Sequence, residues 1–193
     1  NFTGETDVNI MTTGQVTIEK LVTSQVDTIA NASLVITDMV SGAAANFDAA
    51  GSLTIESNDS SLTDLTVDMT TGSTLTLTAD GTNDAITDVT LTSAGNITLA
   101  GSHVTAVKDV DASGVVGTMT VTANDFAALT SYLGAAGVDN IEVDDVTGTA
   151  NIDLKGGDDV FTSTLDSAGT LIINGGAGKD TFNLDNTNTN DIN

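Results

Sequence analysis

Apolar and polar residues alternate in short segments along the chain. Many segments hold an apolar, polar, apolar triplet, such as Leu53-Thr-Ile55, Leu75-Thr-Leu77 and Ile97-Thr-Leu99. A period of two predicts β-strands that turn one face toward a core. Further segments of this kind are Val16-Thr-Ile18, Leu34-Val-Ile36, Met119-Thr-Val121, Ile141-Glu-Val143, Ile152-Asp-Leu154 and Leu171-Ile-Ile173.

The spacing of these triplets is regular. From position 53 they begin every 22 residues, at 53, 75, 97, 119 and 141, and a second alternation lies about half a period later. A fixed step with two strands per period indicates the coil of a solenoid, whose coils stack about 4.8 Å apart. We therefore predict an all-β fold, a right-handed parallel β-helix or β-solenoid. A sandwich of antiparallel strands is the rival, but its loops vary freely in length, so the constant step favours the solenoid.

The pattern divides the chain into three parts. Residues 1–50 are expected to be irregular or to form the first coils, residues 51–150 the solenoid with the 22-residue period, and residues 151–193 glycine-rich coils. Within the second part, residues 124–134 carry Phe126, Leu129 and Leu133 at helical spacing, and a short inserted helix is predicted there. A weaker helical pattern covers residues 41–50.

The net charge of the chain excludes some classes of binding partner. Among 193 residues, 27 acids face four basic residues, for a net charge of −23. Such a chain repels phosphate groups, so we expect no binding to nucleic acid or to an anionic membrane. No apolar run approaches the roughly 18 residues of a membrane span, so we expect no membrane insertion. Cysteine is absent, which excludes disulfides and thiolate metal sites, while the many Val, Ile and Thr residues argue against disorder. The first residues contain neither Met nor a leader, and we expect a segment of a longer protein.

Carboxylates follow several of the triplets, as at Asp144-Asp145, Asp158-Asp159 and Asp180. If coils stack, we expect these corners to form one column of carboxylates along an edge of the solenoid. Neighbours in such a column repel by roughly 0.4–0.9 kcal/mol in water and by more when half-buried. Oxygen ligands in this arrangement suit Ca²⁺. An isolated Asp in a turn more often bonds its own backbone, and we assign that role to Asp59, Asp80 and Asp125.

One corner carries a defined motif. Residues 175–183, GGAGKDTFN, fit the nonapeptide G-G-x-G-x-D-x-U-x, and a degenerate copy 21 residues earlier has Leu154 and Lys155 in place of the first two glycines. The motif resembles that of the calcium-binding RTX proteins. The resemblance implies that Phe161 and Phe182 point inward and that Ca²⁺ is held by carboxylate and main-chain oxygens of Gly157, Asp158, Asp159, Gly175, Gly176, Gly178 and Asp180.

The Thr- and Ala-rich sequence around this motif, including residues 107–121, is similar to repeating segments of surface-layer (S-layer) proteins. Those proteins are secreted by the type I pathway of Gram-negative bacteria. The resemblance implies a structural, non-enzymatic segment at the extracellular cell surface that self-associates into a two-dimensional lattice, with cell-surface polysaccharide as a further candidate partner.

Two alternatives stay open at this point. One is an RTX adhesin or binding module, and the other is a β-helix enzyme that modifies polysaccharide, because acids for glycoside chemistry are abundant. The single histidine, His103, has no G-x-S-x-G motif to accompany it and is not a catalytic candidate.

Overall fold

The computed structural model describes residues 86–101, 104–122, 126–164 and 169–185, with residue 164 as backbone alone. It also describes the backbone of the strands before residue 79 and the side chains of residues 65–67 and 74–76. Within this part of the chain every regular element is a strand. The strands are β1 Phe2–Thr3, β2 Val8–Met11, β3 Val16–Ile18, β4 Leu21–Val22, β5 Gln25–Ile29, β6 Leu34–Ile36, β7 Ala44–Asp48, β8 Ser52–Glu56, β9 Asp64–Met69, β10 Ser73–Thr78, β11 Asp88–Ser93, β12 Ile97–Gly101, β13 Asp109–Val115, β14 Met119–Val121, β15 Ser131–Leu133, β16 Asp139–Glu142, β17 Thr149–Asp153, β18 Val160–Thr164, β19 Thr170–Asn174 and β20 Thr181–Asp185.

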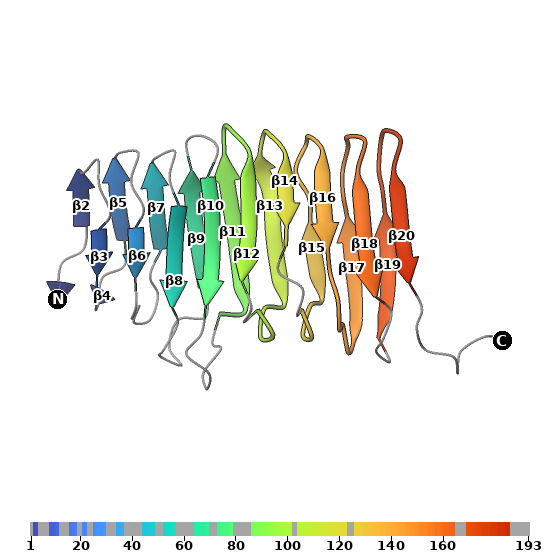
Figure 1. Ribbon diagram of the computed structural model, residues 1–193, viewed down its shortest axis with the longest axis horizontal. Helices are drawn as coiled ribbons and strands as arrows, with labels where there is room; N and C mark the ends of the chain where they lie inside the picture. Colours follow the sequence, from blue (N-terminus) through green and yellow to red (C-terminus); the bar gives the residue numbers. More distant parts are fainter. Residues whose placement is uncertain are drawn as a thin grey trace.

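These strands form two long parallel sheets along one axis (Figure 1). The described strands give nine to each sheet, in the orders β19-β17-β15-β13-β11-β9-β7-β5-β2 and β20-β18-β16-β14-β12-β10-β8-β6-β3, while β1 pairs with β4. From β5 onward the chain alternates between the two sheets, so each coil adds one strand to each. The predicted β-solenoid is therefore confirmed. No helix among the described residues has the length and apolar character needed to cross a membrane.

The register between coils refines the 22-residue period. Leu53 pairs with Leu75, but Leu75 pairs with Leu99 rather than with Ile97, which gives a step of 24 residues. The next steps are 22 to Val121 and 20 to Ile141. Because side chains alternate with a period of two, a shift of two residues leaves the same residues facing the core. The predicted strands are therefore confirmed, although two of the predicted pairings are displaced by two residues.

The core lies between the two sheets. In β11, buried positions alternate with partly exposed ones, and the first sheet buries Val89, Val110, Tyr132 and Ile152 in one column. The opposite sheet contributes a facing column that crosses five successive coils. Its members, all at most 2% exposed, are Leu75, Leu99, Val121, Ile141 and Phe161.

The predicted single edge of carboxylates is wrong. Asp158-Asp159 and Asp180 lie in corners that lead from the first sheet to the second, whereas Asp144-Asp145 follow β16 and lie at the opposite edge. The reason is that the triplets at 152 and 171 belong to β17 and β19 of the first sheet, half a coil away from the others. Asp59, Asp80 and Asp125 lie outside the described residues.

The predicted helix at 124–134 is also wrong. Its described part is a turn closed by the Leu129 N–H on the Phe126 carbonyl at 3.0 Å, followed by β15. Phe126 and Leu129 are both 1% exposed, so their spacing reflects a corner that turns both side chains into the core. In β15 it is Tyr132 that faces inward. Residues 41–50, with the weaker helical pattern, contain strand β7.

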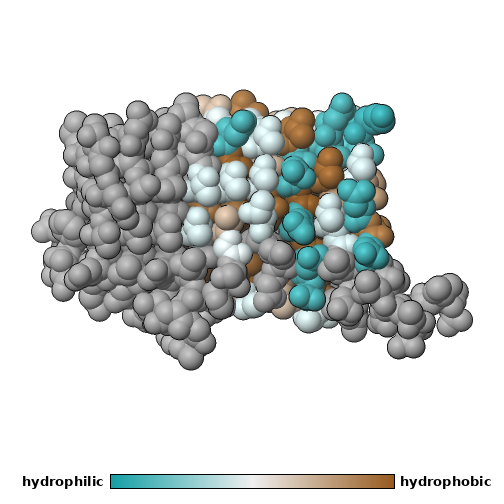
Figure 2. Space-filling model, in the orientation of Figure 1, coloured by the Kyte–Doolittle hydropathy of each residue, from teal (hydrophilic) through white to brown (hydrophobic). Residues whose placement is uncertain are grey.

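Surface chemistry changes along the axis. On the face shown in Figure 2, strongly hydrophilic residues gather over the C-terminal coils, whereas the coloured residues before them are mostly pale. The boundaries at residues 50 and 150 stay a prediction.

Replacement of Leu99 by Ala should test the inter-sheet core. Leu99 is fully buried between Leu75 and Val121, and the cavity left by its truncation is expected to lower the free energy of unfolding by about 2–5 kcal/mol. Urea denaturation followed by circular dichroism measures this loss. Val116→Ala, at a side chain that is 69% exposed, is the control and should change stability by no more than about 0.5 kcal/mol. Equal effects at the two positions would contradict the assigned core.

Candidate metal centre

Three corners stack at one edge of the solenoid. Residues 134–138, 154–159 and 175–180 connect β15 to β16, β17 to β18 and β19 to β20, with Asp139 as the first residue of β16 (Figure 1). A bridge between Gly156 and Ala177 fixes the register of the last two. This register confirms the 21-residue offset of the degenerate motif copy. It also places Gly134-Ala-Ala-Gly-Val-Asp139 in line with the other two corners.

A column of glycines brings the backbones of these corners together. A Cβ on Gly157 would lie 2.5 Å from the Gly137 carbonyl oxygen, and one on Gly137 would lie 2.6 Å from that of Gly117. At Gly178 the same added carbon would overlap the Gly157 carbonyl, and its φ of 138° is one that other residues rarely adopt. The fourth position of each corner therefore requires glycine, which leaves its carbonyl oxygen against the next coil.

The second position of the motif is more tolerant. Gly176 has a φ of 80°, and the aligned Lys155 adopts a left-handed φ of 68°. A non-glycine residue can occupy this region at a cost of about 1 kcal/mol or more. The N–H groups of both residues bond an Asx side chain two positions earlier, Asp153 at 3.2 Å for Lys155 and Asn174 at 3.2 Å for Gly176. The corner conformation is thus the same with and without the glycine.

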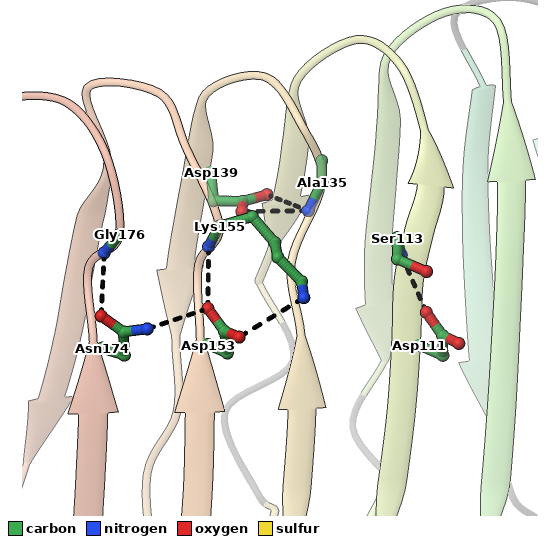
Figure 3. A network of polar contacts seen from close by, with 8 residues as sticks. All are labelled: Asp111, Ser113, Ala135, Asp139, Asp153, Lys155, Asn174 and Gly176. Atoms are coloured by element: carbon green, nitrogen blue, oxygen red, sulfur yellow. Dashed lines mark hydrogen bonds and ion pairs between the residues drawn. The ribbon is translucent and has the colours of Figure 1, made fainter.

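These Asx turns repeat along the edge (Figure 3). Asp111, Asp153 and Asn174 each accept a hydrogen bond from the backbone N–H two residues later. The amide of Asn174 also donates to Asp153 at 3.3 Å, and Lys155 pairs with Asp153 at 3.4 Å. This exposed network stabilises the conformation of the strand ends. Asp153 has a structural role in it, because its carboxylate binds Lys155 and Asn174.

The last residue of each corner forms a second, inner column. It is apolar in the two coils before Asp139, since Ile97, which pairs with Ser73 of the coil before it, pairs next with Met119, and Met119 pairs with Asp139. Asp159 and Asp180 continue it, because Asp159 Oδ1 accepts from the Asp139 N–H at 2.8 Å and Asp180 Oδ1 from the Asp159 N–H at 3.2 Å. A column that is apolar in the middle coils therefore becomes a ladder of carboxylates toward the C-terminus.

The first two members of this ladder are buried. Asp139 and Asp159 are fully buried, and Asp180 is partly exposed. Asp139 folds over its own corner and accepts the Ala135 N–H with both carboxylate oxygens, at 3.3 and 3.1 Å (Figure 3). The Oδ2 atom of Asp159 is buried and has no hydrogen-bond partner in the described part of the chain.

Burial makes ionisation of these groups unfavourable. It raises the pKa of Asp139 to about 7, a rise that the Ala135 N–H opposes and the Asp159 carboxylate enlarges. Burial also raises the pKa of Asp159; the Asp139 N–H opposes that rise, and the charges of Asp180 and Asp158 increase it. An ionised ladder therefore needs positive charge close by.

The structure separates the residues that the motif predicted together. Asp159 and Asp180 lie in the inner ladder, whereas Asp158 is exposed and bonds the Lys179 N–H at 2.8 Å. Gly157 and Gly178 are in the glycine column; Gly175 lies against the Asp180 carboxylate. Phe161 is fully buried as expected, but Phe182 is 44% exposed, since no later described strand pairs with β20.

Sequence reasoning missed Asp139. The signal was present, because Gly134, Gly137 and Asp139 match the motif except for Ala135, 20 residues before the degenerate copy. Because the predicted helix at 124–134 included Gly134 as its last residue, the first glycine of this corner was not recognised as part of the motif.

The donors present fit a hard cation. No group of three or more His, Cys, Asp or Glu side chains within the described ranges is gathered closely enough to hold a metal by itself. Calcium takes six to eight oxygens, so two adjacent carboxylates of the ladder would need backbone carbonyl oxygens as well. The glycine column supplies main-chain carbonyl oxygens two residues before the ladder, and the unpartnered Asp159 Oδ2 has lone pairs free to bind a cation.

Comparison with known protein families, with curated proteins and with solved structures found no match to this chain.

Replacement of Gly178 by Ala should destabilise the corner through backbone strain alone. The new methyl group overlaps the Gly157 carbonyl at a φ unsuited to alanine, so we expect a loss of about 1–3 kcal/mol in unfolding free energy. Thermal melts in EDTA measure the loss without a contribution from metal. Gly148→Ala, where no atom lies within 4 Å of the added carbon, is the matched control and should change stability by less than about 1 kcal/mol.

Stability without metal should fall as pH rises from about 4 to about 7. Asp139 has a folded pKa near 7 and an unfolded value of 3.8, so the folded state holds its proton more tightly. The stabilisation is complete below the unfolded pKa and is lost as pH climbs through the folded one, by up to about 4 kcal/mol. Urea titrations in EDTA at several pH values measure this slope. Asp139→Asn should flatten it, and an unchanged slope would contradict the burial of an ionisable Asp139.

Proposed function

We propose that this chain is a calcium-stabilised structural segment of a secreted bacterial surface-layer protein of the RTX type, working at the extracellular cell surface. The observation that carries the proposal is the ladder of Asp139, Asp159 and Asp180, whose first two members are buried and in which one carboxylate oxygen of Asp159 has no partner. A solenoid whose described residues form no evident reaction centre suits a structural role.

The electrostatics of the ladder favour a bound cation. Carboxylates one coil apart, about 4.8 Å, repel by about 3 kcal/mol at an effective dielectric constant of 20. Lys155 is paired with the exposed Asp153 and Lys179 is itself exposed, so neither is placed within the buried part of the ladder. A divalent cation would neutralise two carboxylates together, and the residues that would hold it are Asp159, Asp180 and the main-chain oxygens of the two glycine corners.

The position of the ladder bears on the alternative functions. Asp139 and Asp159 point into the core, where a polysaccharide chain cannot reach them, which favours metal binding over glycoside chemistry at these residues. We therefore propose no enzymatic activity. Binding of calcium outside the cell would complete the C-terminal coils, and self-association into a two-dimensional lattice would follow from a stiffened solenoid.

Calcium should raise the melting temperature. Each site filled at a hundredfold excess over its dissociation constant adds about 2.7 kcal/mol to the folded state, which corresponds to roughly 5–10 °C for a chain of this size. Melts followed by circular dichroism in EDTA, in CaCl₂ and in MgCl₂ test this, and Mg²⁺ should give the smaller shift because it demands a stricter geometry. Negative-stain microscopy of the same samples should reveal ordered sheets with Ca²⁺ alone.

Asp180→Asn should remove most of the shift that depends on the last corner. Asp185→Asn, on the exposed face of the same strand β20, is the matched control and should retain the full calcium response. Identical melts in EDTA and in CaCl₂ would refute the proposed calcium role. Calcium-dependent stability without any ordered assembly would refute the lattice role alone.

A further inference from the structure

A tyrosine lies in the core beside the carboxylate ladder. Tyr132 is the inward-facing residue of β15 and is 2% exposed, and it pairs with Val110 and Ile152 of the neighbouring coils. Its hydroxyl group is buried and makes no hydrogen bond within the described residues. Native proteins rarely leave a buried hydroxyl in this condition, so the group points to an additional interaction.

The hydroxyl group and the unpartnered oxygen of the ladder belong to one region. Tyr132 stands two residues before the corner that ends in Asp139, and both side chains point into the narrow core. Burial raises the pKa of Tyr132, and the charges of Asp139 and Asp159 raise it further. Asp159 Oδ2 is the second buried polar atom in this region without a partner.

We propose that the Tyr132 hydroxyl oxygen, Asp159 Oδ2 and the Asp139 carboxylate line an interior site for a hard cation, one coil before the GGAGKD corner. The site rests on the proposed function because it shares Asp159 with the calcium site of that corner. It differs in its use of a neutral phenol oxygen and of Asp139.

A cation accounts for more of the site than a water molecule does. Water could bond the hydroxyl group and the carboxylate oxygen, but it would not offset the repulsion between the two buried carboxylates once both are ionised. A hard cation accepts carboxylate and phenol oxygens together and relieves the repulsion. Calcium is the probe that tests this, since its oxygen coordination is flexible.

The decisive variant is Tyr132→Phe, which keeps the ring and removes the oxygen. In EDTA the variant should melt at the same temperature as the parent chain or higher, because it lacks a buried unpartnered group. In CaCl₂ it should melt below the parent chain, because the cation has lost a ligand. The variant is therefore expected to melt below the parent chain only when calcium is present. A variant that melts as high as the parent in both buffers would overturn the proposal.

A second measurement uses Tyr132 as its own reporter. The chain has one Tyr and no Trp, so tyrosine emission arises from this residue alone. Calcium titration should change the emission saturably, and Asp139→Asn should weaken the apparent affinity by about tenfold or more. Glu142→Gln, on the outward face of the same strand β16, is the matched control and should titrate like the parent. Unaltered affinity in Asp139→Asn would count against the site.

The two proposals fail in different ways. If calcium stabilises the parent and Asp180→Asn abolishes the effect, while Tyr132→Phe and Asp139→Asn respond like the parent, the interior site is wrong and the corner site stands. If tyrosine emission follows pH but not calcium, the region holds only a proton or water, and the interior site is again wrong. If calcium stabilises none of the chains, the proposed function itself is wrong.

Discussion

Parallel hydrogen bonding between successive coils is the constraint on which the rest of the structure depends. It sets each residue about 4.8 Å from its equivalent in the next coil, so every repeated choice of residue becomes a column. An apolar column such as Leu99, Val121 and Ile141 gains stability from each added member. A charged column loses stability in the same way, and it must be neutralised or protonated. The chemistry of the edge follows from this geometry.

From Ile97 onward, the inner column changes from apolar residues to carboxylates along the axis. Ile97 and Met119 fill the core by packing, whereas Asp139 and Asp159 stand at the same place with a carboxylate. The neighbouring column is glycine throughout the last corners, because the backbones approach too closely for a Cβ. Carboxylates and bare carbonyl groups therefore meet at one edge of the C-terminal coils.

The fold was accessible from sequence because its signal is robust to errors of register. A shift of two residues, as between Leu75 and its partner Leu99, keeps the same face inward, so the alternation and the approximate period sufficed. The assignment of corners to edges was less robust. The triplets of both sheets have the same pattern, so a corner can be assigned to the wrong edge, half a coil away. The helix prediction at 124–134 failed for a related reason: Phe126 and Leu129 are buried by neighbouring coils, and tertiary contacts produced a spacing that only resembles a helix.

The site was predictable only where the backbone itself dictates the residue. Gly178 is required by its φ and by the Gly157 carbonyl, so the motif around Asp180 was visible, as was its partner Asp159. Lys155 adopts the left-handed conformation that Gly176 adopts, and Ala135 fills the same place one coil earlier, so a complete set of glycines is not needed for the corner. The residue that decides whether a corner carries charge into the core is the aspartate at its end. A count of such aspartates in register, rather than of complete glycine motifs, therefore measures how many coils need a counter-charge, and by that count the coil of Asp139 belongs with the other two.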